Sequence, residues 1–175
     1  MATLAGMGVH YTNAKSAMPS DSFPGLLAFV TGGSPKSTGV YYDDSYDRLL
    51  SAAALEAATA ELHIAQVLVA ARIGTMFGDA MTESRVPDLM ILPQEGVIYT
   101  KPIATKIAEH GGFSEGDVHV PVLVAGPGIA AATVNDAVAT MSIAPTILAV
   151  LGMDPMALQA VKAEGAAILP GLGLK

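Results

Sequence analysis

The fold is decided by the stretch VPVLVAGPG, residues 120–128, in which an apolar run is closed by glycine and proline. A short apolar run bounded by turn residues is typical of a buried β-strand. Pro121 near the start of the run is compatible with a strand, because a missing backbone N–H is tolerated there. The glycine and proline residues that follow predict a turn.

Strands and short helices are expected on both sides of this stretch. Residues 88–92 (DLMIL) and 96–100 (GVIYT) have the pattern of two further buried strands. Ser22 shortly before Pro24 predicts a helix that begins there and ends at Gly32. Two more short helices are expected over 142–151 and 154–165, whereas residues 1–22 read as loop with at most one brief strand.

Residues 46–76 carry the strongest helical pattern, because Ala, Leu and Glu dominate them and no Pro interrupts them. A break near Ala60 or Gly74 is compatible with the pattern. Strands mixed with helices indicate the α/β class, with a mixed or parallel sheet flanked by helices and a long Ala-rich helix. One domain, 1–175, is expected. Its parts are an N-terminal segment (1–48), an Ala-rich helical segment (49–80) and a C-terminal sheet segment (83–171).

The composition excludes several classes of function. The 175 residues carry a net charge of −7, and the Lys and Arg residues occur singly, which argues against nucleic-acid or anionic-lipid binding. No cysteine is available for a disulfide or a thiolate metal site. The most apolar run, 64–73, is too short to span a bilayer, and residues 1–15 lack the pattern of a signal peptide. We therefore expect a soluble protein without a membrane partner or an export signal.

Two residues stand out as candidates for chemistry. Ser22 is placed at a helix N-terminus, where the helix dipole stabilises an anion or a developing alkoxide; the alternative is that Ser22 only caps the helix. His110 lies in the glycine-rich loop EHGGFSEGDV, residues 109–118, and neutral imidazole suits zinc. The alternative is an exposed loop histidine. His119 alternates with the buried valines that follow it, so we expect it to face solvent.

Three motifs together resemble a known family. The run PSDSFPG, residues 19–25, followed by VTG (30–32) and STGV (37–40), resembles the nucleophile segment of the type I phosphodiesterase/nucleotide pyrophosphatase family of the alkaline-phosphatase superfamily. The His-Gly pair at 110–111 is similar to a late loop of that superfamily. The phrase APTIL, residues 144–148, matches a helix near the end of its catalytic domains. The resemblance covers roughly residues 8–48 and 83–171.

The resemblance implies a shortened, alkaline-phosphatase-like α/β fold that hydrolyses phosphoric esters. Ser22 would be the nucleophile and, with His110, a ligand of zinc, of which the family binds two ions. Gly25 takes the position of an Asn that often helps to hold the phosphate in relatives, so it is the candidate substrate-binding position. The implied substrates are phosphodiesters or nucleotides, with phosphomonoesters as an alternative.

The sequence also departs from the family pattern. Relatives have catalytic domains more than twice as long, with a first strand ending in a metal-binding Asp and a middle portion supplying an Asp-His pair. No such pair occurs in this chain, and Thr38 stands where many relatives have His. Nearby carboxylates are candidates to substitute as ligands: Asp21, Asp43, Asp44 and Asp117.

These departures leave three hypotheses open. The chain is a phosphoric-ester hydrolase, an inactive remnant, or half of a split enzyme that acts through protein–protein interaction. Either a homo-oligomer or a complementing chain would then close the open sheet edges that a shortened fold leaves.

Overall fold

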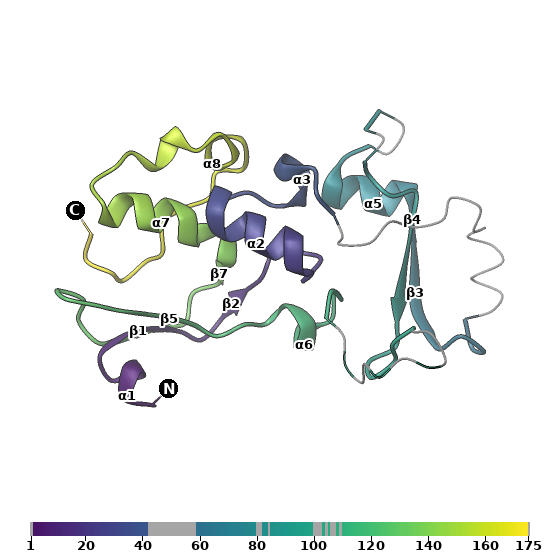
Figure 1. Cartoon of the computed structure of the whole chain (residues 1–175), viewed down its shortest axis with the longest axis horizontal. Coiled ribbons are helices and arrows are strands. Elements are labelled where there is room, and N and C mark those ends of the chain that lie inside the picture. Colours follow the sequence, from purple (N-terminus) through teal and green to yellow (C-terminus); the bar gives the residue numbers. More distant parts are fainter. Residues whose placement is uncertain are drawn as a thin grey trace.

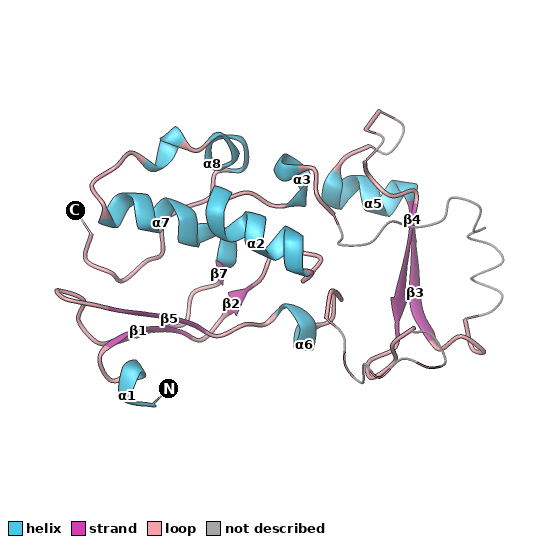
Figure 2. Cartoon of the chain, viewed as in Figure 1, coloured by secondary structure: helices cyan, strands magenta, loops and turns pink. Residues whose placement is uncertain are grey.

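The structure of the chain is a computed structural model that describes residues 2–41, 59–79, 82–83, 85–99, 103, 105, 108 and 110–174. Its elements mix strands and helices (Figures 1 and 2), which confirms the α/β class. The strands are β1 (Gly8–Tyr11), β2 (Ala14–Lys15), β3 (Ile64–Val69), β4 (Leu89–Pro93), β5 (Val122–Ala125), β6 (Ala132–Val134) and β7 (Val138–Ala139). The helices are α1 (Ala2–Ala5), α2 (Ser22–Thr31), α3 (Pro35–Thr38), α5 (Ala70–Phe77), α6 (Glu115–Val118), α7 (Ile143–Val150) and α8 (Gln159–Glu164), with 3-10 turns η1 (Thr140–Ser142) and η2 (Pro155–Ala157).

The sheet nearest the candidate site is built around β1. This strand lies between β5 and β6, antiparallel to β5 and parallel to β6, so the sheet is mixed. Val9 and Tyr11 of β1 are 0% and 1% exposed. They form one core cluster with Ala14, Val122, Leu169 and Leu172. The brief strand expected within residues 1–22 is therefore the central strand of a sheet.

A second core lies between β3, β4 and α5. Strands β3 and β4 pair antiparallel, and α5 packs beside them. The buried members of this core are Tyr41, Leu68, Ile73, Phe77, Val86 and Met90. The ring of Tyr41 meets that of Phe77 edge-on, with centroids 5.2 Å apart.

The Ala-rich helix is shorter than the pattern over 46–76 predicts. Within the described residues it is α5, whereas residues 64–69 form strand β3 and residues 59–63 form turns. Residues 46–58 of the expected helix lie outside the described residues. The error has a physical cause: residues 64–69 pair with β4, and this tertiary pairing overrides the helical preference of the neighbouring sequence.

Other expected elements occur close to their predicted places. The strands over 88–92 and 120–125 are β4 and β5, and the helix over 142–151 is α7. The helix over 154–165 occurs as η2 followed by α8. The strand over 96–100 is wrong, because residues 97–99 form neither strand nor helix.

Helix α2 carries Ser22 and lies beside α7 (Figure 1). It ends at Gly32, whose φ of 70° is left-handed and suits glycine. Pro24 and Ala28 are buried, but several large apolar side chains of α2 are more than 40% exposed. These are Phe23, Leu26, Phe29 and Val30.

Among the described helices, none combines the length and the apolar character that crossing a bilayer requires.

Candidate functional site

Two segments far apart in the sequence run antiparallel toward the site. The pairing begins in the β1–β5 ladder, where Tyr11 lies opposite Val122. It continues beyond the sheet through three backbone hydrogen bonds: Val120 N–H to Ala14 O (3.0 Å), Ser16 N–H to Val118 O (2.8 Å) and Ser20 N–H to Gly112 O (3.3 Å). Because the two segments run antiparallel, the residues that lead to Ser22 lie opposite the residues that follow His110. This register brings Ser22 and His110 together.

Ser22 and His110 are in hydrogen-bond contact across 88 residues of sequence. The hydroxyl Oγ of Ser22 is 3.1 Å from Nε2 of His110. The other ring nitrogen, Nδ1, is 3.1 Å from the carbonyl oxygen of Ser20. Because a carbonyl oxygen only accepts, Nδ1 carries the proton in the neutral ring. Nε2 is then left with a lone pair directed at the Ser22 hydroxyl, which is the arrangement of a base beside a nucleophile.

Asp21 is the residue that caps α2. Its Oδ1 accepts from the backbone N–H of Ser22 at 2.9 Å. The alternative that Ser22 caps the helix is therefore wrong: Ser22 is the first helical residue, and its hydroxyl contacts His110 instead. Oδ1 of Asp21 also lies 3.9 Å from Nδ1 of His110. That distance is too long for a hydrogen bond, and the two groups form an ion pair only when the ring is protonated.

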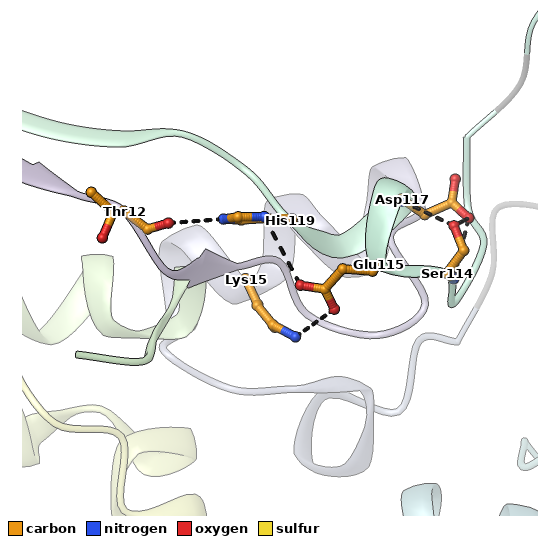
Figure 3. Close-up of polar contacts among 6 residues, drawn as sticks. All are labelled: Thr12, Lys15, Ser114, Glu115, Asp117 and His119. Atoms are coloured by element: carbon orange, nitrogen blue, oxygen red, sulfur yellow. Dashed lines mark hydrogen bonds and ion pairs between the residues drawn. The ribbon is translucent and has the colours of Figure 1, made fainter. Parts of the chain in front are cut away.

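The His110 loop is held by contacts around α6 (Figure 3). Ser114 and Asp117 form a capping box at the helix start. Glu115 accepts from Lys15 Nζ at 2.7 Å, a contact that lowers the pKa of Glu115. His119 Nε2 lies 3.0 Å from Thr12 O, and the His119 side chain is 46% exposed. These contacts tie α6 to the chain around β2 and so fix the loop that precedes it.

A cavity of about 550 Å³ opens beside Ser22 and His110. Its polar lining comes from Ser16, Ser20, Asp21, Ser22, His110 and Thr140, and its apolar lining from Leu26, Phe29, Val120, Pro121, Val122, Leu123 and Ile143, with Gly25 between them. The Ser16 hydroxyl is buried without a hydrogen-bond partner among the described residues. Buried hydroxyls are normally paired, so the unpaired Ser16 hydroxyl is an exception.

Gly25 borders the cavity, as the sequence analysis places it near substrate. Its backbone N–H donates to Asp21 O at 2.9 Å within the helix. A Cβ at this position would meet nothing within 4 Å, so the position has room for a side chain. Its role in substrate binding stays a prediction.

The donors in the described residues do not make a zinc site by themselves. Within that part of the chain, no group of three or more His, Cys, Asp or Glu residues is arranged to hold a metal ion. Ser22 and His110 are adjacent, but a protein zinc site ordinarily has at least three ligands. Of the candidate substitutes, Asp117 is in the capping box, and Asp43 and Asp44 lie outside the described residues.

The sequence pattern missed four contributors to the site. Asp21 was given too little weight as a helix cap, although Asp is a preferred N-cap residue. Ser16 and the carbonyl of Ser20 belong to no motif, and only the long-range pairing brings them to the site. Thr140 is 2% exposed and accepts from Ala17 N at 3.1 Å, which holds η1 against the floor of the cavity.

Comparison with known proteins identifies only the N-terminal part of the chain. No curated protein and no solved structure matches it. A family description does match, over residues 1–63, and it is that of type I phosphodiesterase / nucleotide pyrophosphatase. The segment that holds Asp21 and Ser22 is therefore similar to the type I phosphodiesterase / nucleotide pyrophosphatase family, as its motifs indicate.

Proposed function

We propose that the chain is a phosphoric-ester hydrolase in which Ser22 is the nucleophile. The observation that carries this proposal is the 3.1 Å contact between Ser22 Oγ and His110 Nε2, within a segment similar to a phosphodiesterase family. Members of that family act on phosphoesters or nucleotides and are generally metal-dependent. Phosphodiesters, including nucleotide pyrophosphates, are the proposed substrates.

The proposed reaction begins with attack of Ser22 Oγ on phosphorus, while His110 Nε2 takes the hydroxyl proton and the bond from phosphorus to the leaving oxygen breaks. The leaving group takes that proton. Water then hydrolyses the phosphorylated serine, and a proton from the water returns to Oγ through Nε2. The positive end of the α2 dipole favours the negative charge that collects on the phosphoryl oxygens. Zinc belongs to the proposal through the family resemblance only. Because the described donors are too few, we assign no step to it.

The test is hydrolysis of bis(p-nitrophenyl) phosphate with zinc present. We expect Ser22→Ala to lower kcat/KM by roughly 100-fold or more, because the nucleophile is lost. Ser22→Thr keeps a hydroxyl and should retain part of the rate. Ser37→Ala, an exposed serine on α3, is the control and should match the unmodified chain. Equal rates for Ser22→Ala and the unmodified chain would contradict the proposal.

A second candidate, half of a split enzyme completed by another polypeptide, is favoured by the position of β5. In the described part of the chain this strand pairs on one side only, with β1, and it borders the cavity. An open strand edge beside apolar side chains is a site where another chain can add a strand. Light scattering during size-exclusion chromatography tests this: a stable monomer that hydrolyses the phosphodiester alone would exclude the need for a complementing chain.

A further inference from the structure

The open edge of β5 borders the cavity beside α2. In the described part of the chain, β5 pairs on one side only, with β1. The cavity is lined by four consecutive residues, 120–123. Because successive side chains of an extended segment point to opposite faces, a cavity that touches all four reaches the edge of the segment rather than one face. The described lining includes no residue of β1, so this edge is the one away from β1.

This edge presents backbone hydrogen-bonding groups to the cavity. In an antiparallel pair, alternate residues direct their N–H and C=O toward the partner strand, and the residues between them direct theirs outward. Pro121 has no N–H, so the available donors belong to Val122–Ala125. Proteins commonly protect an open edge with charged side chains, but residues 120–134 contain no Asp, Glu, Lys or Arg. The chemistry of the edge therefore favours another strand.

The α2 side of the same cavity is apolar. Leu26 and Phe29 line it and are 55% and 41% exposed, and Figure 1 shows α2 above β5. A strand added to β5 would carry side chains on both of its faces. Those on the side of α2 would cover Leu26 and Phe29 and remove apolar surface from water. A segment with free backbone amides and apolar side chains thus fits both sides of the cavity.

We propose that this cavity and the open edge of β5 bind an extended apolar segment of another polypeptide by strand addition. A second folded copy of the chain fits less well, because its own β5 is flanked by its own α2, which would have to enter the same space. A single extended segment needs only the spacing of neighbouring strands, about 4.8 Å. Binding requires no chemistry at Ser22, so the proposal goes beyond hydrolysis. It also gives the split-enzyme candidate a mode of docking.

The first test is binding of a synthetic heptapeptide in which valine alternates with threonine, capped at both ends and labelled with fluorescein. Fluorescence polarisation should show saturable binding with a Kd on the order of 10–100 μM. No saturable binding below about 1 mM, a free energy of roughly 4 kcal/mol, would overturn the proposal.

Two N-methylated versions of the peptide separate strand addition from general apolar binding. Alternate amides of an extended peptide lie on the same edge, and only one edge faces β5. Methylation along that edge should weaken binding by about tenfold or more, because two or three backbone hydrogen bonds are lost. Methylation along the other edge should change binding by less than about twofold. Equal binding of the two methylated peptides would overturn the proposal.

Substitutions in α2 test the apolar side of the cavity. Leu26→Glu should weaken peptide binding by about tenfold, because a charge is placed against apolar side chains, and Phe29→Ala should weaken it by about threefold. The control is Leu151→Glu, which adds the same charge at a residue that is 65% exposed and does not line the cavity. Circular dichroism verifies that each variant is folded. Unchanged binding in Leu26→Glu and Phe29→Ala would overturn the assignment of the cavity.

Hydrogen exchange locates the bound strand. Saturating peptide should slow exchange of amides in Val122–Ala125 by about tenfold or more, whereas amides of β6, the other outer strand of the same sheet, should be unaffected. Protection of β6 instead of β5 would overturn the proposal. Light scattering should give the mass of one chain and one peptide. A dimer that protects β5 without peptide would overturn the proposal in favour of a second copy.

This proposal and the proposed function fail separately. Peptide binding at β5 without hydrolysis of bis(p-nitrophenyl) phosphate would support strand addition and contradict the hydrolase. Hydrolysis that Ser22→Ala abolishes, without peptide binding, would do the reverse.

Discussion

At the start of α2, one side chain caps the helix and the next contacts His110. Asp21 accepts the hydrogen bond from the first helical N–H, which leaves the Ser22 hydroxyl to contact His110. The same carboxylate lies near the imidazole ring. A single aspartate therefore caps the helix and also lies beside the candidate base.

Substitution of Asp21 separates these two effects. Asp21→Ala should lower the free energy of unfolding by about 1 kcal/mol, because the cap is lost. Asp21→Ser keeps a cap and should lose only a fraction of that, while both variants should lower phosphodiester turnover because neither leaves a carboxylate beside His110. Urea denaturation and the kinetics of bis(p-nitrophenyl) phosphate hydrolysis measure the two quantities. A fully active Asp21→Ser would mean that the carboxylate acts only as a cap.

Tyr11 makes stability depend on alkaline pH. Burial raises its pKa above 10.0, and its hydroxyl donates to Pro170 O at 2.7 Å. The unfolded chain therefore ionises at lower pH than the folded chain. The resulting stabilisation is complete below pH 10 and is lost as the pH rises through the raised folded value.

Tyr11→Phe tests this dependence. The variant should be less stable by about 1 kcal/mol at neutral pH, because the hydrogen bond to Pro170 is lost. Its melting temperature should then fall less steeply than that of the unmodified chain above pH 10. Tyr41, whose pKa is also raised, remains in both proteins, so some decline persists. Parallel curves would show that Tyr11 ionises equally in the folded and unfolded chains.

The sequence predicted Ser22 and His110 as candidate site residues but not the contacts that orient them. Ser22 and His110 stand in local motifs, so a reading of short segments finds both. The proton on His110 Nδ1 depends on a carbonyl at Ser20, and the unpaired hydroxyl of Ser16 depends on the path of the opposite segment. Contacts of this kind follow from long-range register, which no local pattern encodes.

Helices and strands were predictable where local preference and tertiary pairing agree. The strand at β5 has an apolar run closed by turn residues, and α7 has a helix-forming run; both occur. In β3, by contrast, pairing with β4 overrides the helical preference of the Ala-rich neighbourhood. β1 was underestimated because four residues are too few to display a period.

The glycines that end α2 and α8 provide a matched pair of substitutions. Gly32 and Gly165 both terminate helices with φ of 70°. A Cβ at Gly32 would lie 2.6 Å from Val161 Cγ2, whereas one at Gly165 would meet nothing within 4 Å. We expect Gly165→Ala to cost about 1 kcal/mol for the left-handed conformation. Gly32→Ala should cost about 1–3 kcal/mol more because it overpacks the contact with α8.

Denaturant unfolding of the two glycine variants checks this difference. Equal losses would mean that Val161 moves aside at little cost.

The surface of the chain combines a net charge of −7 with exposed apolar side chains on α2 and α7. Examples are Val30 and Val150, which are 57% and 56% exposed. Apolar surface favours association, while the net charge opposes it until salt screens the repulsion. Whether the chain is a homo-oligomer, and whether residues 1–175 are one domain, stay predictions.

Sedimentation velocity at two ionic strengths tests for association. We expect the associated fraction to rise several-fold between 20 mM and 500 mM salt, because salt shortens the distance over which the like charges repel each other. Val30→Glu combined with Val150→Glu should suppress that rise, because both sites lose apolar surface and gain charge. Neither residue lines the cavity, so phosphodiester hydrolysis should be unaffected. Association that survives in the double variant would assign the interface to another face.

The antiparallel path from β1 and β5 to Ser22 and His110 gives the site an unusual dependence on folding. The two side chains are 88 positions apart in sequence, and closing a loop of that length in the unfolded chain costs roughly 4 kcal/mol of chain entropy, by the logarithmic dependence on loop length. Contacts this distant in sequence are absent from early local structure and form only when the ends of the loop meet. Phosphodiester hydrolysis would therefore be a reporter of loop closure: during refolding, catalytic activity should return together with the β1–β5 ladder and after the local helices.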